Sequence, residues 1–276
     1  MSEVGVVGGQ PPRSRRGTAV VTGASAGIGK VYADRLAARG HDLKLVARRG
    51  DLLDAVARGL RDRYGVRVDT VVADLAATSD LERVAELLAA DPTVSLLVNN
   101  AGTSTMRPVH DTGASALDAM TDVNVTALVR LTLAVLPGMR DRDLGTIVNI
   151  GSVLGFAAIP GSSAYSGTKG YVLNFTRGLQ DEVAGTGVRV QLVLPAATAT
   201  DIWEISGVPL SALDPAIVMT PEALVDAALA GLDLGETVTL PSVEDVRLLA
   251  EYDAARFKLL AASQTGRPAS RYTTPA

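Results

Sequence analysis

Tyr165 and Lys169 are the two side chains whose types and spacing point most directly to chemistry. They lie four residues apart in the segment 165–169, and on a helix that spacing places both on one face. A phenol with its ordinary pKa of about 10 exchanges protons poorly at neutral pH. An ammonium within about 4–6 Å favours the phenolate and lowers that pKa by about 1–3 pH units. Such a pair is suited to moving a proton on or off an alcohol or carbonyl oxygen, although the same spacing also occurs without function on solvated helix faces.

Two further polar residues lie in segments that could bring them to this pair. Ser152 follows the apolar run 146–150 and precedes Tyr165 by thirteen residues. Asn124 lies in the segment 122–125, within a long helical pattern. Each also has an ordinary structural interpretation, Ser152 as a turn hydroxyl at a strand end and Asn124 as a polar residue inside a helix. The four residues together form a candidate site for proton transfer.

A glycine-rich segment near the N-terminus has the composition of a phosphate-binding turn. Residues 22–29 read Thr-Gly-Ala-Ser-Ala-Gly-Ile-Gly, follow an apolar strand-like run and open a helical pattern through Tyr32. A strand, a turn and a helix N-terminus in this order present backbone N–H groups and the positive end of a helix dipole to a phosphate. The glycine spacing differs from the G-x-G-x-x-G of other dinucleotide folds. A second segment, 99–102, closes the apolar run 96–98 with Asn-Asn-Ala-Gly.

The elements that must position these residues alternate along the chain. Strand-like runs alternate with helical periodicity, which predicts a parallel sheet with helices on both faces. We expect strands near Val20 and at 43–46, 68–73, 96–99, 146–150, 188–194 and 237–240. We expect helices at 28–39, 51–63, 79–90, 114–136, 164–184 and 221–233. The pattern predicts an α/β chain, a single-domain Rossmann fold with a doubly wound, seven-stranded parallel sheet.

Three segments fall outside this alternation. Residues 1–16 predict a flexible leader, because their basic residues follow the apolar ones and a secretory signal has the opposite order. Residues 195–220 contain three prolines and no long period, although they belong to the catalytic domain expected at 17–240. Residues 241–276 extend past the last expected strand. We expect them to form a C-terminal helix and tail that pack on the domain or form a subunit contact.

Composition limits the classes of function. The chain has 276 residues, of which 47% are hydrophobic and 20% charged, so it can bury a large core. A net charge of −4 gives no basic surface for nucleic acid. Without cysteine and with two histidines, the sequence predicts neither disulfides nor a metal site. No uninterrupted apolar run approaches the ~18 residues that span a bilayer, so we expect a cytoplasmic protein without a membrane partner.

Taken together, these motifs resemble the short-chain dehydrogenase/reductase family over about Thr18 to Leu240. The resemblance implies a catalytic tetrad of Asn124, Ser152, Tyr165 and Lys169. The reaction of the family is hydride transfer between a nicotinamide and a carbonyl carbon. The resemblance implies that the hydroxyls of Tyr165 and Ser152 donate hydrogen bonds to the carbonyl oxygen. In the family, the lysine holds the nicotinamide ribose and lowers the tyrosine pKa. The asparagine holds, through its helix backbone, a water that links the lysine to solvent.

The resemblance also implies a cofactor site and favours NADP(H). Ala47 stands where NAD-using relatives carry Asp, and Arg48 follows, which can bind a 2′-phosphate. Pro195 and Thr200 match the family after the sixth strand, whereas Ala196 replaces a glycine and requires a negative φ. The implied cofactor-binding positions are Gly23, Ser25, Ala26, Gly27, Ile28, Gly29, Arg48, Arg49, Asp74, Leu75, Asn100, Ala101, Gly102, Tyr165, Lys169, Pro195, Thr198 and Thr200.

In the family, the segment that corresponds to residues 195–220 forms a lid over the substrate. The expected substrate wall is mostly apolar. It comprises Val153, Leu154, Phe156, Ile159 and Trp203, with Met106 and Ile205 also expected from neighbouring loops. It predicts an uncharged, moderately hydrophobic ketone or aldehyde and hence an NADPH-dependent carbonyl reductase. The alternatives are an alcohol dehydrogenase, a 3-oxoacyl-thioester reductase and, outside enzymes, a nucleotide-sensing binding module. A sensor would need neither Tyr165 nor Lys169.

The assembly expected from the resemblance is a homotetramer or homodimer. In the family, the helices near 114–136 and 164–184 form a contact with a second subunit. Those spans are rich in alanine, leucine and valine here. Such an apolar patch would be unusually large on the surface of a monomer.

Overall fold

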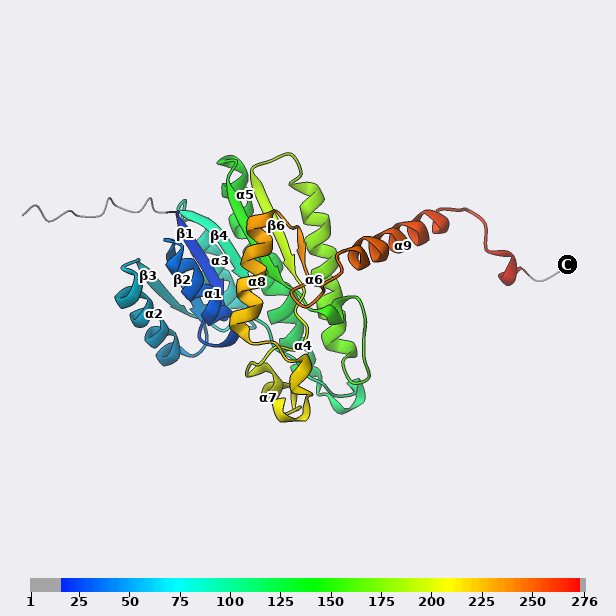
Figure 1. Ribbon diagram of the computed structural model, residues 1–276, viewed down its shortest axis with the longest axis horizontal. Helices are drawn as coiled ribbons and strands as arrows, with labels where there is room; N and C mark the ends of the chain where they lie inside the picture. Colours follow the sequence, from blue (N-terminus) through cyan, green and yellow to red (C-terminus); the bar gives the residue numbers. More distant parts are fainter. Residues whose placement is uncertain (1–15, 274–276) are drawn as a thin grey trace, which may run out of the picture. The chain divides into compact units, whose positions relative to one another are not determined.

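Within residues 16–273, which this computed structural model describes, seven parallel strands form one sheet in the order β3-β2-β1-β4-β5-β6-β7 (Figure 1). The strands are β1 Thr18–Thr22, β2 Asp42–Ala47, β3 Val68–Val72, β4 Val94–Asn99, β5 Gly145–Ile150, β6 Val188–Val193 and β7 Val238–Thr239. The strand order reverses between β1 and β4, and ligands of doubly wound folds bind at the carboxyl ends of the strands at such a point. The predicted Rossmann sheet is confirmed.

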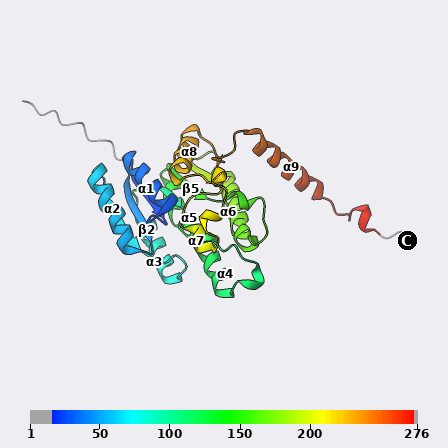
Figure 2. The ribbon, with the colours of Figure 1, turned by 60° about the horizontal axis from the view of Figure 1, so that its bottom comes forward.

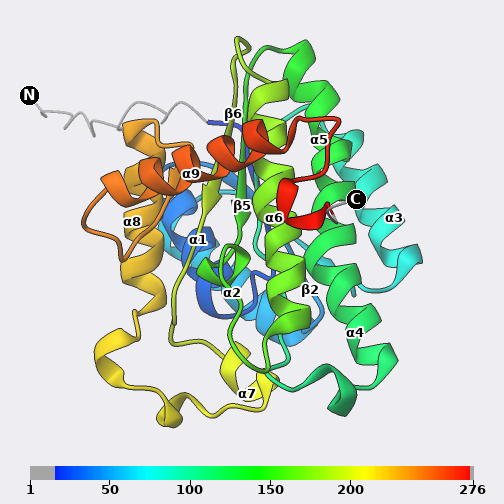
Figure 3. The same cartoon turned by 90° about the vertical axis from the view of Figure 1, so that its right-hand side faces the viewer.

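Helices cover both faces of the sheet. They are α1 Gly27–Ala38, α2 Gly50–Tyr64, α3 Thr78–Ala89, α4 Ala114–Thr121, α5 Leu128–Asp141, α6 Ser163–Glu182, α7 Ile202–Ser206 and α8 Pro221–Leu234. Figure 3 shows α1 and α8 on one side of the strands and α3 and α5 on the other. Every residue of β1, β2 and β5 is buried, as expected for parallel strands covered on both faces.

Alternation along the strands separates two cores. Ala19 and Val21 of β1 pack with α1, α2 and α8, and Val20 packs on the opposite face with α3, α5 and α6. Leu36 of α1 and Leu131 of α5 are each 1% exposed and mark the two cores. Packing in these two cores holds the strands in place. The candidate site is built at the carboxyl ends of those strands.

One long helical stretch contains α4, a π-helical turn at Asp122–Ala127, and α5. The expected end at residue 136 is wrong, because α5 passes through Pro137 to Asp141. A proline removes only one helical hydrogen bond, and continuing the helix buries Met139 completely. A π-helical turn within an α-helix often marks a functional position, and this one carries Asn124.

The same stretch corrects the expectation on membrane-spanning length. Within residues 16–273, Ala114–Asp141 is long and apolar enough by composition to cross a membrane, with a mean hydropathy of 1.4 in its most apolar window. The window contains few charged residues, so its mean hydropathy is high even though polar residues interrupt every apolar run within it. Its inward residues Leu131, Val135 and Met139 lie in the core of the sheet, and 39% of the most apolar window is buried within the chain.

The segment after β6 contains α7 and two short 3₁₀ turns, Leu210–Ala212 and Pro215–Ile217. Thr198 forms a β-bridge with Met219, which closes this segment on itself. Figure 2 shows α7 and α4 at the same end of the sheet. The expected lid therefore has a defined structure at the carboxyl edge.

The chain divides into two units, residues 1–241 and 242–276. In the second unit, α9 Arg247–Ser263 is followed by a 3₁₀ turn at Ser270–Tyr272. The Arg256 guanidinium lies 5.3 Å from the centre of the Tyr252 ring. The role expected for 241–276 stays a prediction, and the expected leader lies, except for Arg16, outside the described residues.

Candidate active site

Helix α6 carries Tyr165 and Lys169 one turn apart. Both side chains are buried, with exposed fractions of 9% for Tyr165 and 6% for Lys169. Lys169 Nζ lies 5.7 Å from the centre of the Tyr165 ring. It donates a hydrogen bond of 3.0 Å to the carbonyl oxygen of Ile150, the last residue of β5. This bond holds the ammonium at the carboxyl edge of the sheet, where the strand order reverses.

Burial sets the proton affinities of this pair. It raises the pKa of Tyr165 to about 12, and a hydrogen bond with the Ser152 hydroxyl acts in the opposite direction. Burial lowers the pKa of Lys169 to about 8. The expected lowering of the tyrosine pKa by Lys169 is wrong for this structure. The ammonium lies over the ring and bonds a backbone carbonyl, so the cost of burying a phenolate dominates. Tyr165 therefore stays protonated at neutral pH in this structure.

Asn124 connects two segments of the site through its side chain. Its Oδ1 accepts from the backbone N–H of Thr103 at 2.9 Å, and its Nδ2 donates to the Thr103 carbonyl at 2.9 Å. Nδ2 also donates to Thr168 Oγ1 at 3.0 Å, and that hydroxyl donates to the carbonyl oxygen of Tyr165 at 2.7 Å. The π-helical turn thus fixes both the loop after β4 and the helix that carries Tyr165. Sequence reasoning missed this side-chain role and that of Thr168.

Ser152 lies just past the end of β5 and is 7% exposed. Its Oγ accepts a hydrogen bond from the Leu154 backbone N–H at 3.1 Å, which holds the hydroxyl at the start of a 3₁₀ turn. Its hydrogen bond with Tyr165 brings both hydroxyls to one place. The structure therefore assembles all four predicted tetrad residues, whose catalytic roles stay predictions.

The turn between β1 and α1 can adopt its path only with glycines. Gly23 and Gly27 have φ values of 68° and 52°, which side chains strongly disfavour. A β-carbon on Gly29 would lie 2.5 Å from Asn100 Nδ2. The Asn100 amide itself donates to the Thr22 carbonyl at 2.8 Å and holds the turn against β4. No side chain caps α1 among the described residues, so its first N–H groups suit a phosphate.

Arg48 and Arg49 follow β2 on the same edge. Arg49 Nη1 lies 3.5 Å from Asp201 Oδ2, and its Nη2 lies 3.4 Å from Ser25 Oγ. This guanidinium therefore connects the glycine turn to the start of α7. Ala47 places no carboxylate at the end of the strand. The arrangement fits a phosphate ester beside Arg48 and Arg49.

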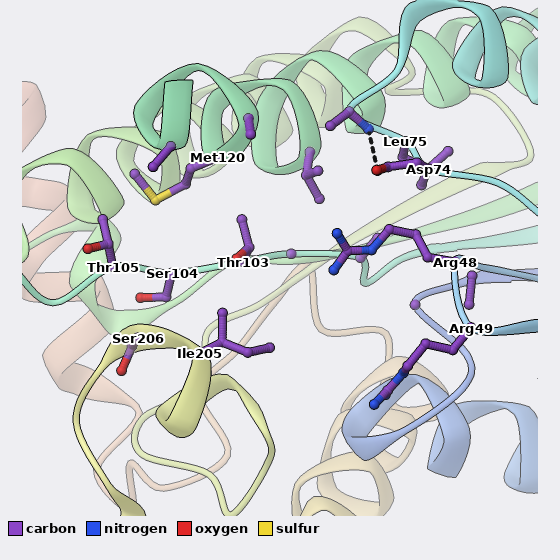
Figure 4. Close-up of a pocket in the computed structure, with 18 of the residues that line it drawn as sticks. Arg48, Arg49, Asp74, Leu75, Thr103, Ser104, Thr105, Met120, Ile205 and Ser206 are labelled. Atoms are coloured by element: carbon purple, nitrogen blue, oxygen red, sulfur yellow. Dashed lines mark hydrogen bonds between the residues drawn. The ribbon is translucent and has the colours of Figure 1, made fainter. Parts of the chain in front are cut away.

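A cavity of about 660 Å³ runs along this edge. Figure 4 shows Arg48 reaching across it toward Thr103, with Asp74 and Leu75 at one end and Ser104, Met120 and Ser206 at the other. One Asp74 carboxylate oxygen accepts from the Ala76 N–H at 3.1 Å, which shapes that end. The cavity brings together eight of the predicted cofactor-binding residues, namely Gly23, Ser25, Arg48, Arg49, Asp74, Leu75, Ala101 and Gly102.

The other predicted cofactor residues are not part of the cavity lining. A β-carbon on Gly102 would lie 3.9 Å from Lys169 Nζ, and one on Gly27 would lie 3.1 Å from Thr200 Cγ2. Among residues 16–273, the one non-glycine residue with positive φ is Asp143. Ala196 thus has the negative φ that its methyl group requires. Further predicted positions that the cavity lining does not include are Ala26, Ile28, Gly29, Asn100, Tyr165, Pro195 and Thr198.

Of the predicted substrate wall, Ile205 lines the cavity, whereas Val153, Leu154, Phe156, Ile159 and Trp203 do not. The Trp203 indole donates to the Thr198 carbonyl at 2.8 Å and stabilises the lid internally. Val153 packs in a small core beside α6. Phe156 and Ile159 are 41% and 52% exposed. Leu154 lies in the same 3₁₀ turn as Val153. The prediction assumed that apolar residues near Ser152 and in the lid face the substrate. Instead, Trp203 bonds within the lid and Val153 packs in the small core.

Sequence reasoning missed most of the second half of the cavity. Its lining includes the loop residues that follow β4, one side of α4 and the end of α7. The missed residues are Thr103, Ser104, Thr105, Met120 and Ser206. The loop could have been found from its place directly after the Asn-Asn-Ala-Gly segment at a strand end. Met120 of α4 and Ser206 of α7 have no local sequence signal.

The chain matches the family model described as short chain dehydrogenase over residues 17–207. It belongs to the short-chain dehydrogenase/reductase family and is an oxidoreductase of that family. Among curated proteins, it is 36% identical over 220 residues to the very-long-chain 3-oxoacyl-CoA reductase of Anas platyrhynchos. That match covers 78% of this chain and 69% of the relative.

Solved structures are more similar and cover more of the chain. A short-chain dehydrogenase from Sphingobium yanoikuyae in complex with NADPH is 43% identical, with a TM-score of 0.90, over 93% of this chain and 100% of that one. The bulky-bulky ketone specific alcohol dehydrogenase from Comamonas testosteroni is 39% identical, with a TM-score of 0.85, over 94% and 99%. The fold and family predicted from the motifs are thereby confirmed.

Proposed function

We propose that this protein is an NADPH-dependent oxidoreductase that interconverts a carbonyl and an alcohol in an uncharged, moderately hydrophobic small molecule. The observation that carries the proposal is the buried Tyr165, hydrogen-bonded to Ser152 and placed beside Lys169 at the edge where β5 and β4 end. A donor that stays protonated at neutral pH, beside a second hydroxyl, suits a carbonyl oxygen that gains negative charge.

The residues present fit NADPH. The uncapped N-terminus of α1 and the turn at Gly23 and Gly27 suit a pyrophosphate. Arg48 and Arg49 suit a 2′-phosphate, which a carboxylate at position 47 would repel. The Sphingobium yanoikuyae relative is described in complex with NADPH, which supports this choice. When bound, the cofactor supplies the hydride.

The protein's own groups orient the substrate and move the proton. Tyr165 and Ser152 donate hydrogen bonds to the carbonyl oxygen, and Tyr165 delivers its proton to that oxygen in reduction. Lys169 keeps further N–H donors besides the one bonded to Ile150, and these would hold ribose hydroxyls. Asn124 keeps the loop at Thr103 and helix α6 in register through its three hydrogen bonds.

The cavity and two relatives support the proposed substrate class. The half of the cavity between α4 and α7 includes Met120, Ala116 and Ile205 and can take an apolar substituent. The Comamonas testosteroni relative is described as specific for bulky-bulky ketones, which supports a ketone with two large substituents. The name of the Anas platyrhynchos relative supports a second candidate, reduction of a 3-oxoacyl thioester.

A substrate panel tests the proposal. Purified protein is supplied with NADPH or NADH and with bulky ketones, a 3-oxoacyl thioester or the corresponding alcohols, while cofactor absorbance is followed. We expect NADPH-dependent reduction of at least one ketone class. Cofactor binding without turnover on any member of the panel would favour the nucleotide-sensing module instead.

We further propose that the protein is a cytoplasmic homodimer or homotetramer, with neither a nucleic-acid nor a membrane partner. Only 39% of the most apolar window of Ala114–Asp141 is buried within the chain. Leu133 on α5 and Tyr171 on α6 are 62% and 48% exposed. A second copy would cover such apolar surface on α5 and α6.

A further inference from the structure

Ser104 has a buried hydroxyl with no partner in the described part of the chain. Its residue is 7% exposed, and no hydrogen bond to its Oγ forms within residues 16–273. Buried polar groups are normally hydrogen-bonded, and one left without a partner lowers stability. Ser104 lines the cavity that contains the predicted cofactor residues. The orphaned hydroxyl therefore points to an absent ligand atom.

The neighbouring Ser206 gives a direct contrast. It lines the same end of the cavity, and Figure 4 shows it across from Ser104. However, Ser206 Oγ donates to the Trp203 carbonyl at 2.7 Å, so its hydrogen is already used within the lid. Of these two serines, Ser104 is the one whose hydroxyl is left to a ligand.

The loop that carries Ser104 is held rigidly beside the catalytic groups. Asn124 binds both the N–H and the carbonyl of Thr103, the preceding residue. A β-carbon on Gly102 would lie 3.9 Å from Lys169 Nζ. Ser104 follows Gly102 by two residues, which span at most about 7 Å of backbone. Ser104 therefore lies close enough to Lys169 for one small substrate to reach both. Figure 4 places it at the end of the cavity away from Arg48 and Asp74, the end opposite the predicted adenosine site.

We propose that Ser104 Oγ donates a hydrogen bond to a second oxygen of the substrate, separate from the reacting carbonyl. Ser104 thereby selects ketones with a nearby ester, thioester or second carbonyl over monoketones of the same length. This inference rests on the proposed function, because it names a specificity residue of the same site. A site built around a hydrogen bond discriminates against analogues that lack the partner atom.

The test compares two substrates of equal chain length, ethyl 3-oxohexanoate and nonan-4-one. Wild type should prefer the oxo ester in kcat/KM. Ser104→Ala should lower kcat/KM for the oxo ester about tenfold or more and leave that for nonan-4-one within about twofold. Ser206→Ala, which removes a hydroxyl that is already bonded, should leave the ratio between the two substrates unchanged.

Two binding measurements separate this inference from the proposed function. Without ligand, Ser104→Ala should melt at the same or a higher temperature than wild type, since an orphaned hydroxyl is removed. The oxo ester should raise the melting temperature of wild type more than that of Ser104→Ala, both without cofactor and with NADP+, which cannot reduce the ester. An equal response of the two proteins, or an equal loss of turnover on both substrates, would overturn the role of Ser104. Weaker NADPH binding in Ser104→Ala would also overturn it and assign the hydroxyl to the cofactor. Absence of NADPH binding to wild type would contradict the proposed function alone.

Discussion

At the scale of residues, the site depends on burial as much as on residue type. The spacing of Tyr165 and Lys169 and the motifs around Asn124 and Ser152 were enough to predict which residues meet. Their proton affinities were not predictable from spacing, because desolvation depends on how the whole fold covers α6. Burial raises the pKa of Tyr165 to about 12 and lowers that of Lys169 to about 8. This makes tyrosine the stable acid and lysine the group that titrates first.

The titration of Lys169 predicts a pH dependence. We expect kcat/KM for NADPH, measured in reduction at saturating ketone, to be level below about pH 8 and to fall above it. This ratio reports ionisations of the free enzyme, and Lys169, with its pKa lowered to about 8, loses its charge as the pH rises through that value. Tyr165 stays protonated up to its pKa of about 12 and adds no earlier fall. In Lys169→Arg, which keeps its charge, the inflection should disappear; its persistence would assign it to another group.

Arg48 predicts the choice of cofactor. We expect wild type to prefer NADPH over NADH at least about tenfold, because Arg48 can pair with a 2′-phosphate and position 47 has no carboxylate. Arg48→Ala should raise KM for NADPH far more than KM for NADH, which acts as an internal control. Equal increases for both cofactors would remove Arg48 from the phosphate site.

At the scale of elements, helix α6 and the π-helical turn carry Tyr165, Lys169 and Asn124, and the turns at the strand ends carry the predicted phosphate-binding residues. The sequence could predict each strand and most helices, because hydrophobic periodicity follows burial on both faces of a parallel sheet. It could not predict that α5 continues through Pro137 or that a π-helical turn contains Asn124, since packing against the sheet decides both. It also could not predict that Trp203 bonds within the lid, because lid contacts join residues without a regular spacing.

The β1–α1 turn gives a test at this scale. Gly29→Ala places a β-carbon 2.5 Å from Asn100 Nδ2, which bonds the carbonyl of Thr22 and so holds the start of the turn against the segment after β4. We expect a loss of about 1–3 kcal/mol of unfolding free energy and at least about tenfold weaker NADPH binding, measured by urea unfolding and fluorescence titration. Gly59→Ala in α2 is the matched control, since nothing lies within 4 Å of its β-carbon; it should be neutral or stabilising. Similar losses in both variants would contradict a special need for glycine at 29.

At the scale of the whole molecule, one sheet and its two cores hold the site, and some apolar surface remains on the outer helices. The sequence could predict the seven-stranded sheet because the family motifs follow the strand-like runs in the order that the family has along its chain. It could not predict most of the second half of the cavity, whose walls come from the loop after β4, α4 and α7. The proposed subunit contact would use the exposed faces of α5 and α6, which carry Leu133 and Tyr171.

The exposed apolar residues on α5 and α6 predict association. We expect light scattering at micromolar concentration to give at least twice the chain mass of 28.5 kDa. Leu133→Lys should lower that mass, because it places a charge in the contact while leaving the core unchanged. A wild-type mass near that of one chain would refute the homo-oligomer.

The central claim is that Tyr165 donates the proton in an NADPH-dependent reduction. The most direct measurement is single-turnover oxidation of bound NADPH by a bulky ketone in Tyr165→Phe compared with wild type. Losing one donor to a developing oxyanion costs about 10²–10³ in rate, and Tyr165 supplies both a donor and the proton. The account predicts that Tyr165→Phe binds NADPH with nearly unchanged affinity and reacts at least about a hundredfold more slowly. A variant that binds NADPH normally and keeps more than about a tenth of the wild-type rate would contradict it.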